Sequence, residues 1–174
     1  MNRIRLVVDI TMFFLTFLLM NVNLVSPLWH EIFGIITSFL IILHLVLNFK
    51  WIRNITKNFK KVKSKTRFLF IVDALTFFFY FITIVIGILI SISIFNFKTS
   101  YNPYLMLIHH ITGRLSLSLM LVHLGFHFNR IIVKLAKTET VKGIIYIIYI
   151  MICIIIVMYL FYSLVRSYVW QSLM

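Results

Sequence analysis

The sequence has few of the residues that mark disulfide-bonded domains or common soluble enzymes. Its 174 residues include one cysteine, two prolines, five glycines and only four acidic residues. The single cysteine, Cys153, excludes an internal disulfide and a thiolate-bound metal cluster. The chain also lacks a Gly-rich phosphate-binding loop and a serine nucleophile with a base, which argues against the common nucleotide-binding and hydrolase classes.

Apolar residues are abundant instead. Hydrophobic residues make up 62% of the chain and charged residues 12%, with a mean hydropathy of +1.05. A soluble domain of this size could not bury so much apolar surface, so we expect a lipid bilayer around the protein. The net charge of +13 would suggest nucleic acid in a soluble protein. Here the positive residues lie between apolar runs, where membrane topology explains them better.

Five apolar runs are long enough to cross about 30 Å of hydrocarbon as helices. They cover residues 6–25, 29–49, 68–97, 104–129 and 144–165. Ser26-Pro27 and Asn102-Pro103 mark two helix starts, because each places a capping residue before a proline that suits the first turn. The predicted fold is an all-α integral membrane protein with five transmembrane helices.

The basic residues predict the orientation of these helices. Fourteen of the 17 lysines and arginines lie at the N-terminus or in the loops after the second and fourth runs. Loops rich in Lys and Arg stay in the cytoplasm. We therefore expect a multi-pass membrane protein with its N-terminus in the cytoplasm and its C-terminus outside.

The first four runs contain an internal repeat. Val8-Asp9 followed by Phe13-Phe14 in the first run matches Val72-Asp73 followed by Phe77-Phe78 in the third. The second run has His30, Gly34, His44, Leu45 and Asn48, and the fourth has His109, Gly113, His123, Leu124 and His127 at identical spacing. Two helical hairpins therefore look like related units, arranged about a pseudo-two-fold axis along the membrane normal. The fifth run lies outside the repeat.

The repeated histidines have the spacing of haem ligands. Fourteen residues place two side chains about 40° apart around a helix and about 21 Å apart along it. Since the two helices are parallel, His30 should meet His109 near the outer side of the membrane, and His44 should meet His123 nearer the inner side. Each pair can supply two axial imidazoles to one haem iron. We predict two b-type haems in a four-helix bundle, with the fifth helix as an addition.

Other residues of these helices are weaker candidates. Gly34 and Gly113 would let a flat macrocycle approach the backbone, and Arg114 and His127 are possible contacts of the haem propionates. Snorkelling of Arg114 and an interfacial place for His127 are the alternatives. His110 is the alternative ligand to His109, although its spacing of 13 from His123 puts the two about 140° apart.

Several plainer interpretations stay open. Helix–helix hydrogen bonds alone could explain the histidines, whereas zinc or copper is less natural because the four form two separated pairs. Glu31, beside His30, could orient an imidazole, carry a proton or be a solvated interfacial acid. Asp9 and Asp73 are expected at helix N-terminal ends, in a structural role.

The motifs also resemble a known family. Trp29-His30-Glu31-x2-Gly34, then His44-Leu45, Asn48 and Lys50-Trp51-Ile52, resemble the opening hairpin of small bacterial membrane proteins, long listed as a domain of unknown function and now described as flavinylation-associated cytochromes. His123-Leu124-Gly125-x-His127 is similar to their second hairpin. The resemblance covers roughly residues 5–130. It implies a di-haem bundle distantly similar to cytochrome b, with His30, His44, His109 and His123 as ligands.

The resemblance also implies a function. Family members are implied to pass electrons across the membrane to flavinylated, FMN-carrying extracytoplasmic proteins, with a quinol or a cytoplasmic protein as possible donor. We accordingly expect residues 1–135 to form the di-haem bundle and residues 136–174 the fifth helix with a short outer tail. The protein would be an electron carrier rather than a stand-alone catalyst. The alternatives are a haem-free transporter or scaffold subunit, and a self-contained ferric or quinone reductase.

Overall fold

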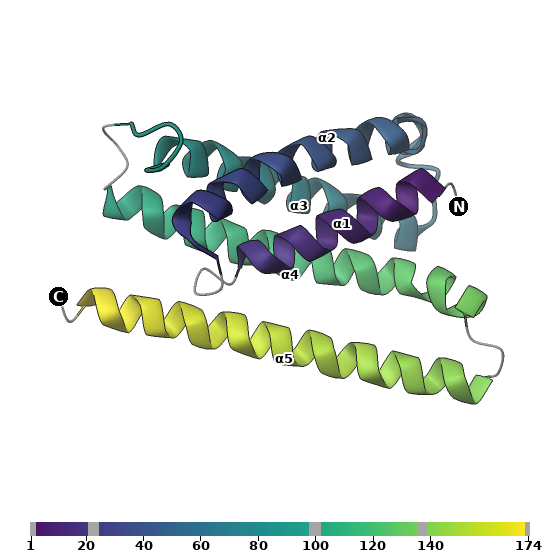
Figure 1. Cartoon of the computed structure of the whole chain (residues 1–174). Helices are drawn as coiled ribbons and strands as arrows, with labels where there is room; N and C mark the ends of the chain where they lie inside the picture. Colours follow the sequence, from purple (N-terminus) through teal and green to yellow (C-terminus); the bar gives the residue numbers. More distant parts are fainter. Residues whose placement is uncertain (1–2, 21–24, 98–101, 136–138, 173–174) are drawn as a thin grey trace. The chain divides into compact units, whose positions relative to one another are not determined.

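The structure is a computed structural model that describes residues 3–20, 25–97, 102–135 and 139–172. Its regular elements are five helices (Figure 1): α1 (Arg3–Leu19), α2 (Pro27–Asn58), α3 (Ser64–Leu89), α4 (Pro103–Leu135) and α5 (Glu139–Ser172). The prediction of an all-α protein with five helices is confirmed.

Four helices are long and apolar enough to cross a membrane. These candidate spans are Pro27–Asn58, Ser64–Leu89, Pro103–His127 and Glu139–Ile156. Large apolar side chains cover their outer faces; Phe39 on α2 is 68% exposed. Such a surface suits lipid and not water, so the chain is a multi-pass membrane protein. In α1, 17 residues are described, and the predicted first span continues onto residues 21–24, which lie outside the described part.

The chain divides into two compact units, Met1–Leu117 and Ser118–Met174, and each is described by itself. The first unit contains α1, α2, α3 and the N-terminal part of α4. The second contains the remainder of α4 and α5. The predicted division at residue 135 between bundle and added helix stays a prediction.

The predicted end of the third helix is wrong. The run of apolar residues continues to Phe97, but α3 ends at Leu89 and a turn follows. The Glu31 carboxylate accepts hydrogen bonds from the backbone N–H groups of Ile92, Ser93 and Ile94, at 2.8–3.0 Å. These N–H groups therefore have a partner other than a helical carbonyl, and the helix stops before them. Asn96 in this turn has a φ of 46°, which asparagine tolerates better than most residues.

The predicted helix starts are confirmed. Ser26 is the N-cap of α2 and Pro27 its first residue, although the serine side chain makes no capping hydrogen bond. The Asn102 side-chain oxygen accepts from the N–H groups of Tyr104 and Leu105, at 3.0 and 3.2 Å. It therefore satisfies two of the donors that the first turn of α4 leaves open.

Buried hydroxyl groups occupy the middle of the first unit. Thr16, Thr37 and Ser116 are almost completely buried, and Thr37 and Ser116 lie midway between the two histidines of their helices. The Thr16 hydroxyl donates to the Met12 carbonyl and lies 3.3 Å from the Tyr80 hydroxyl. Thr16 and Tyr80 follow Asp9 and Asp73 by seven residues, so they are equivalent in the repeat. Contact between equivalent residues is expected where a two-fold axis passes between α1 and α3.

Candidate functional site

The structure brings together the predicted outer histidine pair. His30, on the first turn of α2, and His109, on the second turn of α4, have ring centres 6.2 Å apart. An imidazole nitrogen sits about 2 Å from a metal it binds and about 1 Å from its ring centre, so two trans imidazoles on one ion have ring centres about 6 Å apart. The spacing therefore suits two axial ligands. It also falls within the range of direct aromatic contact.

His109 is held by groups on α3. Its Nδ1 donates a hydrogen bond to the Thr83 carbonyl at 2.9 Å, and the Thr83 hydroxyl donates to that of Thr112, one turn along α4. A ring that donates from Nδ1 keeps a lone pair on Nε2, which is the tautomer that a metal ligand requires. The α3 contacts thus orient the ring and fix its available nitrogen.

Gly87, also on α3, makes room for the same ring. A Cβ at this position would lie 3.0 Å from Cε1 and 3.4 Å from Nδ1 of His109. Any side chain there would push the imidazole away from the Thr83 carbonyl. Gly87 is therefore part of the outer site, although the sequence analysis did not single it out.

The other outer candidates lie close by. The Nδ1 atom of His30 is buried and has no hydrogen-bond partner among the described residues. A buried ring nitrogen without a partner is costly, so the site favours a ligand or ion that would satisfy it. The His110 ring lies 6.0 Å from that of His109. The anchoring of His109 by Thr83 and Gly87 favours His109 over His110 as the ligand.

At the other end of α2, His44 has a carboxylate partner. Its Nδ1 lies 2.7 Å from Oδ1 of Asp9 on α1 and donates the hydrogen bond. Nε2 faces the amide nitrogen of Asn48 at 3.4 Å, a long contact. A carboxylate on one ring nitrogen orients an imidazole and raises the basicity of the other nitrogen, as it does for many metal-bound histidines.

This contact corrects the interpretation of Asp9. Because α1 begins at Arg3, Asp9 lies well inside the helix and not at its positive end. Asp73 likewise lies in the third turn of α3. The repeat of Val-Asp in both odd runs was the signal in the sequence that could have drawn attention to Asp9.

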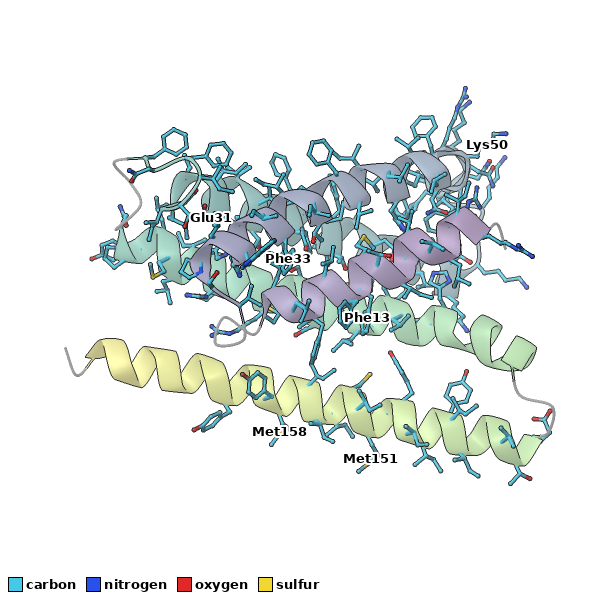
Figure 2. All side chains as sticks on the ribbon, in the orientation of Figure 1. Phe13, Glu31, Phe33, Lys50, Met151 and Met158 are labelled. Atoms are coloured by element: carbon cyan, nitrogen blue, oxygen red, sulfur yellow. The ribbon has the colours of Figure 1, made fainter. Side chains whose placement is uncertain are left out.

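Glu31 has hydrogen-bond partners that none of its open interpretations included. Besides the three N–H groups, its carboxylate accepts from the Ser91 hydroxyl at 2.8 Å. Figure 2 shows Glu31 on α2 near the turn that follows α3. Both carboxylate oxygens are therefore engaged by the residues after α3.

His123 and His127 lie in the second unit, with ring centres 4.5 Å apart. Nearby, the Tyr149 hydroxyl of α5 donates to the Leu121 carbonyl at 2.6 Å. A Cβ on Gly125 would lie 2.9 Å from that hydroxyl, so the glycine allows the α5 tyrosine to pack against α4. On α5 itself, the side chains of Met151 and Met158 are exposed (Figure 2).

The remaining predicted residues are the two glycines of the repeat and the possible propionate contacts. A Cβ on Gly34 would meet nothing within 4 Å, whereas one on Gly113 would lie 3.3 Å from Met20 and 3.6 Å from Thr83. Gly113 therefore serves helix packing, and Gly34 has space beside it. Arg114 is half-buried on α4, one turn after His110. Contacts of Arg114 and His127 with propionates stay predictions.

The residues of the outer pair fit a haem better than a bare metal ion. They offer two imidazoles at the spacing of trans ligands, one in the required tautomer and one with an unpartnered buried nitrogen. Within the described residues, no group of three or more His, Cys, Asp or Glu side chains converges as a metal site.

Comparison of the chain with protein-family models, curated proteins and solved structures finds no match.

Proposed function

We propose that the protein is a membrane b-type cytochrome that carries electrons across the cytoplasmic membrane through two haems. The observation that carries the proposal is the outer pair, in which the His30 and His109 rings lie 6.2 Å apart and His109 is fixed by Thr83. Bound between such imidazoles, a haem supplies reversible one-electron chemistry at its iron.

The protein residues would bind, orient and insulate the cofactor. At the outer level His30 and His109 are the proposed ligands, with Thr83 and Gly87 holding the second ring in place. Two axial imidazoles leave no position for oxygen or peroxide, which favours electron transfer over catalysis at iron. Apolar helices around the site exclude water and set the potential.

Different observations support the proposed inner ligand pair, His44 and His123. His44 already has the carboxylate partner that metal-bound histidines commonly have, in Asp9. His123 lies in the second unit and is proposed as the other ligand on its spacing from His109 and its place in the repeat. The two levels would be about 21 Å apart along the helices.

The proposed partners follow from the topology. Figure 2 shows Lys50 in the C-terminal part of α2, where nitrogen-tipped side chains gather. Eight lysines and arginines lie between residues 50 and 67, and the sequence from 32 to 72 has no acidic residue. This end would face the cytoplasm, with a quinol or a cytoplasmic protein as donor, and the outer end would pass electrons to an FMN-carrying extracytoplasmic protein.

An absorption spectrum tests the proposal. Detergent-purified protein, oxidised and then reduced with dithionite, should show the low-spin bands of b-type haem, with two haems extracted per chain. One haem per chain would mean that one histidine pair is wrongly assigned. A colourless protein, even after expression with ample haem, would refute the proposal and favour a transporter or scaffold. Donor and acceptor assays would then separate a relay subunit from a complete ferric or quinone reductase.

A further inference from the structure

We infer that Glu31 is a positioning residue for the outer histidine pair, acting as a clamp between α2 and the turn after α3. The inference rests on the proposed function for its redox consequence but not for the clamp itself. Four groups donate to the carboxylate: the Ser91 hydroxyl and the N–H of Ile94 to Oε2, and the N–H of Ile92 and Ser93 to Oε1. The Phe95 N–H donates in turn to the Ser91 hydroxyl at 3.0 Å.

The clamp joins the two elements that carry the outer site. Glu31 directly follows His30 in α2. The turn that it binds directly follows the last turns of α3, where Thr83 and Gly87 contact the His109 ring. A fixed distance between Glu31 and this turn therefore fixes α2 relative to α3, and α3 positions His109. Protein contacts therefore connect His30 with His109 through Glu31, the turn and the end of α3.

Only a carboxylate can make this set of contacts. Each Glu31 oxygen accepts two hydrogen bonds, from one hydroxyl and three backbone N–H groups in all. A glutamine would keep one acceptor oxygen and turn an N–H₂ group toward donors. An alanine would leave the four donors without their carboxylate partner. The turn sequence Ser-Ile-Ser-Ile, residues 91–94, contains no acidic residue. The negative charge that its N–H groups bind therefore comes from Glu31 on α2.

The redox consequence follows from preorganisation. A ligand pair keeps its geometry when the residues around it are locked. Loss of the clamp should let α3 move relative to α2 and should loosen His109 against His30. The inner level, held by Asp9 and His44, has separate contacts and should be spared.

The first experiment needs no haem. Hydrogen exchange in detergent should be about tenfold or more faster at the amides of Ile92, Ser93 and Ile94 in Glu31→Ala than in wild type, with Glu31→Gln between them. In haem-depleted protein, diethylpyrocarbonate should modify His30 and His109 faster in both variants. Glu139→Gln, which removes an acid at the exposed start of α5, is the matched control and should change neither readout.

The second experiment reads the haems. Redox titration of wild type should show two components, and the one lost in His44→Ala is the inner haem. In Glu31→Gln the outer component should shift or decrease while the inner component stays unchanged. Equal loss of both components would overturn the positioning role and leave a general effect on folding. Unchanged exchange in Glu31→Ala would overturn the clamp, whereas a colourless wild type with accelerated exchange would refute the proposed function alone.

Discussion

The two histidines of α2 have different partners, although the repeat gives them matching places. His44 donates to the Asp9 carboxylate, whereas Nδ1 of His30 is buried without a partner among the described residues. An imidazole that donates to a carboxylate gives more electron density to a bound metal, and a stronger electron donor stabilises the ferric state. The two proposed haems should therefore have different potentials, with the inner one lowered by Asp9.

Replacement of Asp9 tests this difference. Asp9→Asn keeps the size of the side chain but removes its charge, so the His44 imidazole loses its anionic hydrogen-bond acceptor. We expect the midpoint potential of the inner haem to rise and haem to be retained about 10- to 100-fold less tightly. Redox titration and haem extraction measure the two effects. An unchanged inner component would contradict the role given to Asp9, and Glu139→Gln serves as the charge control.

Gly87 gives a second test at the same scale. In Gly87→Ala the new methyl group would lie 3.0 Å from Cε1 of His109, so the ring has to move away from Thr83. We expect loss or spectral change of the outer haem with the inner one intact. Gly143→Ala, where a Cβ meets nothing within 4 Å, should have no effect. Identical spectra for both variants would argue against His109 as a ligand.

At the scale of helices, the sequence predicted the elements better than their ends. Apolar run length located all five helices, and Asn102 marked one start. Hydropathy could not locate the end of α3, because five of the eight residues from 90 to 97 are large and apolar, which continues the apolar run. That end depends on Glu31, which is about 60 residues away in the sequence. Likewise α2 runs past the predicted end at Phe49 to Asn58, since its basic residues are good helix formers outside the membrane.

The same limit applied to the candidate site. Regular spacing predicted the outer pair, because helical geometry fixes which residues of one helix share a face. Gly87, Thr83 and Asp9 act on histidines of other helices, and a single sequence carries no direct record of such contacts. Only the repeated Val-Asp pairs hinted at one of them.

The packing of α5 can be tested as an element. Gly125→Ala would place a methyl group 2.9 Å from the Tyr149 hydroxyl and should destabilise the second unit, by about 1–3 kcal/mol. In Tyr149→Phe the bond to the Leu121 carbonyl is lost, but so is the clashing oxygen. The double variant should therefore be less destabilised than the sum of the single variants, as thermal unfolding in detergent would show. Strict additivity would mean that the two side chains do not meet.

For the whole molecule, the proposed orientation gives a direct prediction. In a Cys153→Ser background, Lys61→Cys lies in the basic turn between α2 and α3, and Tyr104→Cys lies at the start of α4. A membrane-impermeant maleimide should label Tyr104→Cys in intact cells and Lys61→Cys only in inverted vesicles. The reverse pattern would place the basic turn outside and would invert the proposed direction from donor to acceptor.

The contact between Thr16 and Tyr80 has a consequence for which helical hairpins can pair with each other. Thr16 already donates to the Met12 carbonyl, so the phenol of Tyr80 donates across the axis. Two copies of the first hairpin would bring together two threonines, which are too short to reach each other, and two copies of the second would bring together two bulky rings. Only a threonine opposite a tyrosine fills the space at the axis and forms the hydrogen bond. This asymmetry favours pairing of a first hairpin with a second hairpin and disfavours association of two like hairpins from neighbouring molecules in a crowded membrane.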